Sequence, residues 1–298
     1  MSASTTTSLP GRERPGTWLS RMPRNRSLLI VPALALVIAF FVYPVVSLSL
    51  DSVLKPTPGF THYVDALTSS TTTTILIRTL KVAAIVTALT LALSYPYAYL
   101  LTLVRGRARL LLVFLVLLPF WTSLMARTFA WVVLLQPGGI VAKLTSPLGI
   151  GEAGLLGTQA GVTLAMAQVL LPFMVLPLYS SMTSIDRRLL AAAQSMGASR
   201  WTAFRTVFLP LSVPGVAAGS VLVFILSIGF WVTPRLVGSP QQSLVGQLIA
   251  TKVEKLLDFE SAGALSVIIL VVTAVILVSV QRIVRRLSPS LPTAGGDR

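Results

Sequence analysis

Long apolar runs separated by short charged connections dominate the pattern of hydrophobic and polar positions along the chain. These runs contain no Asp, Glu, Lys or Arg, apart from a single arginine, Arg127, in the third of them. A bilayer core about 30 Å thick needs roughly 20 apolar residues in a helix, so each run is long enough to span a membrane. We therefore predict an all-α integral membrane protein with six transmembrane helices, in residues 28–50, 82–104, 110–136, 153–185, 206–234 and 261–281.

Some of these runs carry features that a single straight helix does not explain. The two longest, 153–185 and 206–234, exceed what one span needs, so we expect a turn at one end of each. Prolines occur inside the runs, and a packed bundle tolerates them because neighbours can satisfy the freed carbonyls. They either only kink the helices or shape a transport pathway, and the sequence leaves both readings open.

The composition excludes most soluble functions and most side-chain chemistry. The chain is 54% hydrophobic and only 11% charged, with a mean hydropathy of +0.82, whereas a soluble domain is about a quarter charged. It has no Cys and one His, His62, which excludes disulfides, Cys-ligated zinc and multi-His metal sites. No Lys precedes Ser or Thr, so the chain has no phosphate-binding G-x-x-x-x-G-K-[ST] loop. We expect no catalytic residues, no metal and no cofactor bound by this chain.

The basic residues predict the orientation of the spans. The chain carries 24 Lys and Arg against 9 Asp and Glu, a formal charge of +15. The segments on the same side of the membrane as the N-terminus hold most of this excess. Connections rich in Lys and Arg favour the cytoplasmic side. We therefore expect a multi-pass protein of a bacterial plasma (inner) membrane, with both termini in the cytoplasm. Because the excess is spread over four cytoplasmic segments, it does not indicate nucleic-acid binding.

The two ends of the chain differ from the apolar part. Residues 1–27 are rich in Ser, Thr and Arg, as in a transit peptide or in a disordered tail, and we favour a disordered cytoplasmic tail. Residues 288–298 carry Pro and Gly and are predicted to be disordered as well. The six-helix transmembrane domain is predicted to occupy 28–287.

The cytoplasmic connection between the fourth and fifth spans, residues 186–210, has a pattern of its own. Its sequence, DRRLLAAAQSMGASRWTAFRTVFLP, places Leu189, Ala193 and Met196 at helical spacing before Gly197. Glycine after such a run indicates the end of a helix, because it enters the left-handed region without a steric clash. Ser199 can cap a second helix. We predict two short amphipathic helices joined at Gly197, with the fifth span beginning at 209–210.

This connection resembles the loop that couples binding-protein-dependent ABC importer permeases to their ATPase. The family pattern is Glu-Ala-Ala, three residues, Gly, nine residues, Ile, one residue, Leu-Pro. The chain departs from it in having Ala191 where the family often has Glu, and Val207 stands at the Ile position. The matching residues are Ala192, Ala193, Gly197, Leu209 and Pro210.

Four further stretches narrow the resemblance. LPFWTSLMARTFAW, LPFMVLPLYSSM, FRTVFLPLSVPG and GFWVTPRLVGSP are similar to the spermidine/putrescine-type permeases. The resemblance implies a type I importer permease, with polyamine as the expected solute. It also implies a second, unlike permease subunit, two ATP-binding subunits that hydrolyse ATP, and an extracytoplasmic solute-binding protein. A permease for another small organic solute, such as an opine or amino acid, an ion-coupled carrier working alone, and a membrane scaffold remain alternatives.

Two sets of candidate site residues follow. Arg127 either bonds backbone carbonyls or snorkels outward as a structural element, or lines the pathway or subunit interface together with Trp121 and Trp231. A charge within the bilayer must face protein or water, and a positive one would repel a bare polycation. The resemblance implies that the ATPase-coupling loop comprises Leu190, Ala191, Ala192, Ala193, Met196, Gly197, Ala198, Trp201, Phe204, Leu209 and Pro210.

Overall fold

The computed structural model of this protein describes residues 31–55, 58–146 and 154–287, and all regular structure in these ranges is helical. The predicted disordered tails, 1–27 and 288–298, lie outside the described residues. The chain divides into two compact units, Met1–Leu48 and Ser49–Arg298.

The first predicted span is a helical run, Val31–Leu54, with a mean hydropathy of 2.4 in its most apolar window. It consists of α1 (Val31–Val37), the π-helical turn η3 (Ile38–Val42) and α2 (Tyr43–Leu54). The wider turn ends two positions before the proline at position 44, which lacks a backbone N–H and interrupts the regular hydrogen-bond ladder.

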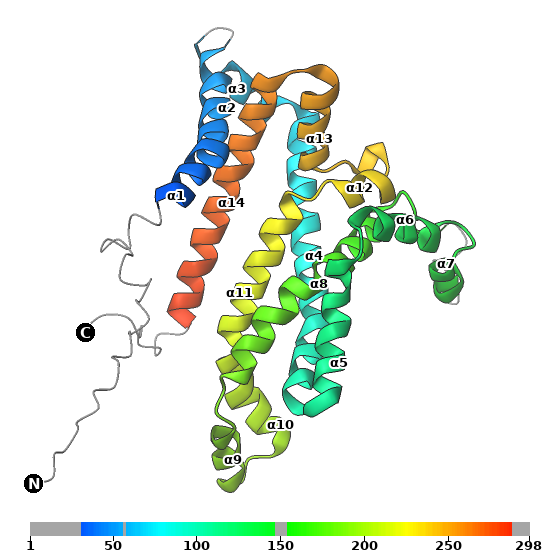
Figure 1. Ribbon diagram of the computed structural model, residues 1–298, viewed down its shortest axis with the longest axis vertical. Helices are drawn as coiled ribbons and strands as arrows, with labels where there is room; N and C mark the ends of the chain where they lie inside the picture. Colours follow the sequence, from blue (N-terminus) through cyan, green and yellow to red (C-terminus); the bar gives the residue numbers. More distant parts are fainter. Residues whose placement is uncertain (1–30, 56–57, 147–153, 288–298) are drawn as a thin grey trace, which may run out of the picture. The chain divides into compact units, whose positions relative to one another are not determined.

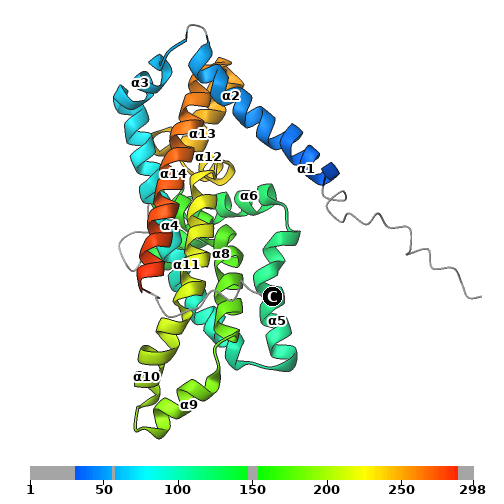
Figure 2. The ribbon, with the colours of Figure 1, turned by 90° about the vertical axis from the view of Figure 1, so that its left-hand side faces the viewer.

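Three helices form the centre of the second unit, namely α4 (Ser70–Leu103), α8 (Gln159–Thr183) and α11 (Leu209–Ile228). They pack side by side, with α8 in contact with both of the others (Figures 1 and 2). In α8, 67% of the most apolar window is buried, against 33% in α4. A span that is surrounded by protein needs apolar side chains on all its faces, which is why α8 shows no amphipathic pattern.

Two glycines of α11 allow it to approach α8 closely. Gly215 and Gly219 form a G-x-x-x-G pair, a spacing that lets transmembrane helices pack backbone to backbone. A Cβ atom added to Gly215 would lie 2.5 Å from the Cβ of Ser181, and one added to Gly219 would lie 2.7 Å from the sulfur of Met174. Both neighbours belong to α8. The Cβ of Ser181 cannot move without its backbone, so the contact requires glycine at position 215, whereas at position 219 the Met174 side chain would have to shift.

The second span begins earlier than the charge-free run predicted. Helix α4 starts at Ser70, with the hydroxyl of Ser69 accepting a hydrogen bond from the amide of Thr72, whereas the prediction began at residue 82. The charge-free criterion stopped at the two basic residues in this first part of the helix. One of them, Arg78, donates a hydrogen bond to the carbonyl of Ser243, 3.3 Å away, so its charge has a protein partner.

The third predicted span is a broken one, which corrects the prediction of a single helix over 110–136. Helix α5 (Gly106–Leu117) continues into the 3₁₀ turn η4 (Leu118–Trp121), and α6 (Leu124–Leu135) follows at an angle of 99°. Figure 2 shows this corner between α5 and α6. Pro119 lies in the 3₁₀ turn, and the two residues that follow this turn, Thr122 and Ser123, are not helical and separate the segments.

Short helices precede the last span. They are α3 (Thr61–Thr68), α7 (Ile140–Thr145), α12 (Val232–Val237), η7 (Pro240–Gln242), α13 (Val245–Thr251) and η8 (Lys252–Leu256), and the last span is α14 (Phe259–Leu287). Turns replace helix at residues 154–158 and 229–231, as expected for the two longest runs. In the described residues, five helices are long and apolar enough to cross a membrane, and the bent pair α5–α6 makes six.

The carboxylate of Asp258 stabilises the turn at the start of α14. Its Oδ2 lies 2.9 Å from the ammonium of Lys252, and its Oδ1 accepts the backbone N–H of Ser261 at 3.0 Å. Partial burial alone would raise the pKa of Asp258, but the hydrogen bonds from Lys252 and Ser261 outweigh this effect and hold the pKa below its usual value. The ionised carboxylate therefore stabilises the turn that leads into the last span.

Replacing Gly215 by Val should destabilise the bundle by about 1–3 kcal/mol, because the added atoms overlap Ser181 of α8. Ala218→Val is the matched control, since Ala218 is exposed on the same helix. Thermal unfolding of the two purified variants in detergent measures the difference. Equal melting temperatures for Gly215→Val and Ala218→Val would contradict the close contact.

The folded pKa of Asp258 is lowered, so its contribution to stability is present above a pH of about 4, the unfolded value, and is lost as the pH falls through the folded value. Asp258→Asn should therefore lower the melting temperature at pH 7, and the difference from the unaltered protein should shrink towards pH 3. The loss should be about 1 kcal/mol or less, since surface ion pairs contribute little. A difference that does not change with pH would contradict this role for the carboxylate.

Candidate functional site: the hairpin between α8 and α11

The connection between the fourth and fifth spans folds as a helical hairpin. Helix α9 (Arg187–Ser195) begins at Asp186, whose carboxylate accepts the N–H of Arg188 at 2.9 Å. At the other end Gly197 adopts a φ of +90°. Its N–H binds the carbonyl of Gln194, and the N–H of Ala198 binds the carbonyl of Ala193. This is the hydrogen-bond pair of a Schellman motif, and it confirms the predicted helix end at Gly197.

The second half of the hairpin differs from the prediction. Ser199 accepts the N–H of Thr202 at 3.1 Å and caps α10 (Arg200–Ala203), as expected. The chain then passes through the π-helical turn η6 (Phe204–Phe208) directly into α11, so that Arg200–Ile228 is one helical span. Leu209 and Pro210 lie inside this span and do not begin it. Because the wider η6 turn precedes Pro210, the helix continues past a residue without an N–H.

The outer side of the hairpin exposes small and apolar side chains. Ala191, Ala192 and Gly197 are exposed, and Met196 and Trp201 are exposed by 83% and 68%. Within the described residues nothing covers these positions. A large exposed apolar surface of this kind is typical of a docking site for another protein or of contact with a membrane.

The inner side of the hairpin packs on the bundle through aromatic rings. Phe204 stacks between Trp201 and Phe208, with ring centroids 5.7 and 5.5 Å apart. Tyr99 of α4 meets Phe204 and Phe208 edge-on at 5.3 and 5.1 Å, and such pairs stabilise packing. Tyr95, one turn earlier, places its hydroxyl 2.9 Å from that of Ser212 in α11. We call these rings of residues 95, 99, 201, 204 and 208 the aromatic cluster.

The remaining coupling residues lie between these two sides. Ala193 is buried, Leu190 and Ala198 are half-buried, and Leu209 and Pro210 are exposed at the start of α11. The predicted residues thus fall on one continuous hairpin. Sequence reasoning did not connect Tyr95 and Tyr99 of α4 with the hairpin, although their spacing of four places them on one helix face.

Within the described residues, no hydrogen bond, ion pair or ring contact joins the other candidate residues, Trp121, Arg127 and Trp231, to one another. Trp121 ends η4, is 76% exposed and lies beside Phe114, with ring centroids 5.7 Å apart. Arg127 lies in the first turn of α6 and donates to the carbonyl of Thr122 at the break, 3.3 Å away. Trp231 precedes α12, which packs on α6.

The guanidinium groups of Arg127 and Arg235 both interact with neighbouring protein groups. The guanidinium of Arg235 lies 5.5 Å from the ring centroid of Trp231 and binds Glu254 at 3.2 Å. The Nε atom of Arg127 is buried and has no hydrogen-bond partner among the described residues. A role for Arg127 in the pathway or in a subunit interface stays a prediction.

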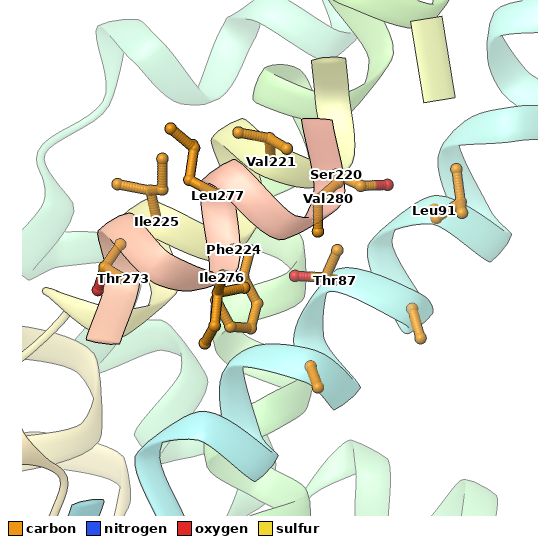
Figure 3. Close-up of a pocket in the computed structure, with 12 residues that line it drawn as sticks. Thr87, Leu91, Ser220, Val221, Phe224, Ile225, Thr273, Ile276, Leu277 and Val280 are labelled. Carbon is orange, nitrogen blue, oxygen red and sulfur yellow. The ribbon is translucent and has the colours of Figure 1, made fainter. Parts of the chain in front are cut away.

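An apolar hollow of about 370 Å³ lies between α4, α11 and α14 (Figure 3). Its wall carries few polar groups, and the hydroxyls of Thr87 and Thr273 donate to carbonyls of their own helices, those of Ala83 and Ile269. Among the described residues, no Asp or Glu lines the hollow, so its wall offers no carboxylate that would bind a cation. Its lining is unlike a site for a polyamine and is suited to hydrocarbon.

Comparison with known proteins agrees with the hairpin pattern. A family model for the binding-protein-dependent transport system inner membrane component matches residues 27–292. The spermidine/putrescine transport system permease protein PotB of Haemophilus influenzae is 35% identical over 175 residues, which are 58% of this chain and 61% of that protein. PotB of Escherichia coli K12 is 32% identical over 216 residues, 72% of this chain and 78% of that one.

The fold agrees as well. A crystal structure of a bacterial alginate ABC transporter, in complex with an alginate pentasaccharide-bound periplasmic protein, matches with a TM-score of 0.69 at 20% sequence identity. The match covers 88% of this chain and 94% of that chain. The predicted type I permease fold is therefore confirmed. At this identity the likeness concerns the fold alone.

These findings confirm the resemblance expected from residues 186–210. The relatives are permease subunits and not enzymes, and they are multi-pass proteins of the inner membrane. The family model covers far more than half of the chain. The chain belongs to the family of binding-protein-dependent transport system inner membrane components, as a permease of a type I ABC importer.

Proposed function

We propose that this chain moves a polyamine such as spermidine or putrescine into the cytoplasm by alternating access, driven by a separate ATPase. The observation that carries the proposal is the hairpin 186–210, which is exposed on its outer side and joined to the bundle on its inner side. Two ATP-binding subunits would dock on such hairpins, and the cofactor ATP would be bound and hydrolysed by them.

The hairpin is built to transmit a displacement. Its second half is continuous with α11 from Arg200 to Ile228, so a push on α10 moves the span as a rigid element. The aromatic cluster joins the same segment to α4 through Tyr99 and Phe204. A docked subunit that grips Ala191, Ala192 and Met196 would therefore act on two spans at once.

The remaining partners complete the transporter. A second permease subunit, an unlike chain, would pair with this one, and an extracytoplasmic solute-binding protein would deliver the solute. The basic segments, including Arg187 and Arg188, would place the hairpin and both termini in the cytoplasm. The alginate transporter of similar fold was crystallised with its periplasmic protein, which supports a partner of that class.

The polyamine assignment rests on the PotB relatives, at 32% and 35% identity. The single arginine within the third span, Arg127, gives it no electrostatic support, because like charges repel. Another small organic solute, opine- or amino-acid-like, is the second candidate for this reason.

Reconstitution separates these possibilities. The chain is placed in proteoliposomes with its partner permease, ATPase and binding-protein subunits, and uptake of labelled spermidine, putrescine and an amino acid is measured with and without enclosed ATP. ATP-dependent polyamine uptake supports the proposal. Uptake of the amino acid alone would overturn the substrate, and uptake by this chain without ATPase, driven by an ion gradient, would overturn the importer mechanism.

Gly197→Asp should uncouple ATP hydrolysis from transport while leaving insertion into the membrane intact. An added Cβ meets no atom within 4 Å, but the φ of +90° strains any residue with a side chain, by about 1–2 kcal/mol. Solute-stimulated ATPase activity of the assembled transporter measures the effect. A loss of about tenfold is expected when a strain of that size weakens docking of the ATPase subunit.

Gly138→Asp is the matched control for this variant. Gly138 also has a positive φ, +75°, and open space around it, but it lies between α6 and α7 and outside the hairpin. It should keep its solute-stimulated ATPase activity. Equal losses in the two variants, or preserved stimulation in Gly197→Asp, would count against docking at the hairpin.

A further inference from the structure

A basic pocket lies beside the hairpin, apart from the coupling surface described above. It has a volume of about 260 Å³, and Arg105, Arg109 and Arg187 line it together with the hydroxyl-bearing Thr102 and Thr183. The three arginines come from different segments: the α4–α5 turn, the first turn of α5 and the start of α9. The fold therefore brings Arg187 beside two arginines of the α4–α5 connection, which lies far from it in the sequence.

Two of these arginines are held in place by the end of α4. The Nε of Arg109 donates to the carbonyl of Val104 at 3.0 Å. An Nη of Arg187 donates to the carbonyl of Thr102. These carbonyls lie at a helix C-terminus, which carries partial negative charge and attracts cations. Each guanidinium has five N–H donors, so most of them remain for a ligand.

The pocket lacks a compensating carboxylate. The ion pairs between side chains of the described residues involve other basic residues, namely Lys55, Arg235 and Lys252. The nearest acidic residue along the chain, Asp186, uses its carboxylate to cap α9 at the N–H of Arg188. Three positive charges that line one small pocket repel one another, and an anion would relieve this repulsion.

The position of the pocket favours an anion carried by a lipid. It lies where α4 ends at Leu103, α5 begins at Gly106 and α8 ends at Thr183, which are ends of three candidate membrane spans. Lipid headgroups lie at the ends of spans. Beside the pocket, Leu103, Leu110 and Leu111 are exposed by 49%, 71% and 66%. A phospholipid combines the two features that these residues require, an anionic headgroup for the arginines and acyl chains for the leucines.

We propose that the pocket formed by Arg105, Arg109 and Arg187 binds the phosphate group of an anionic phospholipid. Arginine suits this ligand because its planar fork of donors matches phosphate oxygens. Basic pockets between transmembrane helices are a known type of site for anionic headgroups. Since Arg187 opens α9, a bound headgroup also fixes the first turn of the hairpin to the ends of α4 and α5.

Native mass spectrometry of the full-length chain in mild detergent tests the proposal by counting bound phosphatidylglycerol during a titration. Arg105→Gln and Arg187→Gln should each weaken binding about fivefold, the effect of removing one basic residue near an anionic headgroup. Arg107→Gln and Arg188→Gln are the matched controls. Each lies within two positions of a pocket arginine and is exposed, but neither lines the pocket, so both should bind as the unaltered chain does.

Two further arms identify the ligand and guard against misfolding. Phosphatidylcholine should not replace phosphatidylglycerol, and inorganic phosphate in the millimolar range should not displace it. Arg187→Lys should retain more binding than Arg187→Gln, because the charge remains, and a melting curve for each variant confirms that it is folded.

The opposite results would overturn the proposal. An equal loss of phosphatidylglycerol binding in Arg107→Gln or Arg188→Gln would mean that the lipid is attracted to basic surface in general. Full displacement of the lipid by inorganic phosphate would mean that the pocket binds a free anion. If Arg105→Gln and Arg187→Gln bind lipid as the unaltered chain does but no longer co-purify with the ATPase subunit, the arginines bind an acidic protein surface. None of these outcomes depends on which solute is transported.

Discussion

The contact between α8 and α11 determines how the rest of the second unit is arranged. Gly215 and Gly219 bring the backbone of α11 against Ser181 and Met174 of α8, and α8 is in turn packed against α4. A lipid environment provides no hydrophobic force between helices, so close packing of small residues has to hold such a bundle together. Because α11 is continuous with α10, this contact also determines the direction in which the hairpin leaves the bundle.

The hairpin has two sides with different tasks. The aromatic cluster connects it to α4 and α11, while Ala191, Ala192 and Met196 remain exposed on the other side. In the proposed importer, the exposed side receives the ATPase and the inner side passes its displacement to two spans. The proposed lipid site, through Arg187, would hold the first turn of the same hairpin at the membrane surface. A conformational signal and a lipid contact would then meet within one short segment.

The sequence was most informative where a local rule operates. The Schellman motif at Gly197 and the cap at Ser199 follow from the conformational freedom of glycine and from the hydroxyl acceptor of serine. The six apolar runs follow from bilayer thickness. The same rules failed at Pro119, where apolar residues continue on both sides of a 99° bend. Hydropathy records that these residues avoid water and contains no information about the direction of the helix.

Charge, apolar length and helix-end signals in the sequence by themselves determined the fold class, the number of spans and the helix ends at Gly197 and Ser199. Only the tertiary structure decided what each side chain meets. It placed Tyr99 against Phe204, α11 against α8, and Arg105, Arg109 and Arg187 around one pocket. The physical reason is that helix formation and membrane insertion depend on neighbouring residues along the chain. Packing instead depends on which faces meet across large sequence separations, and in an almost uniformly apolar span no amphipathic pattern marks those faces.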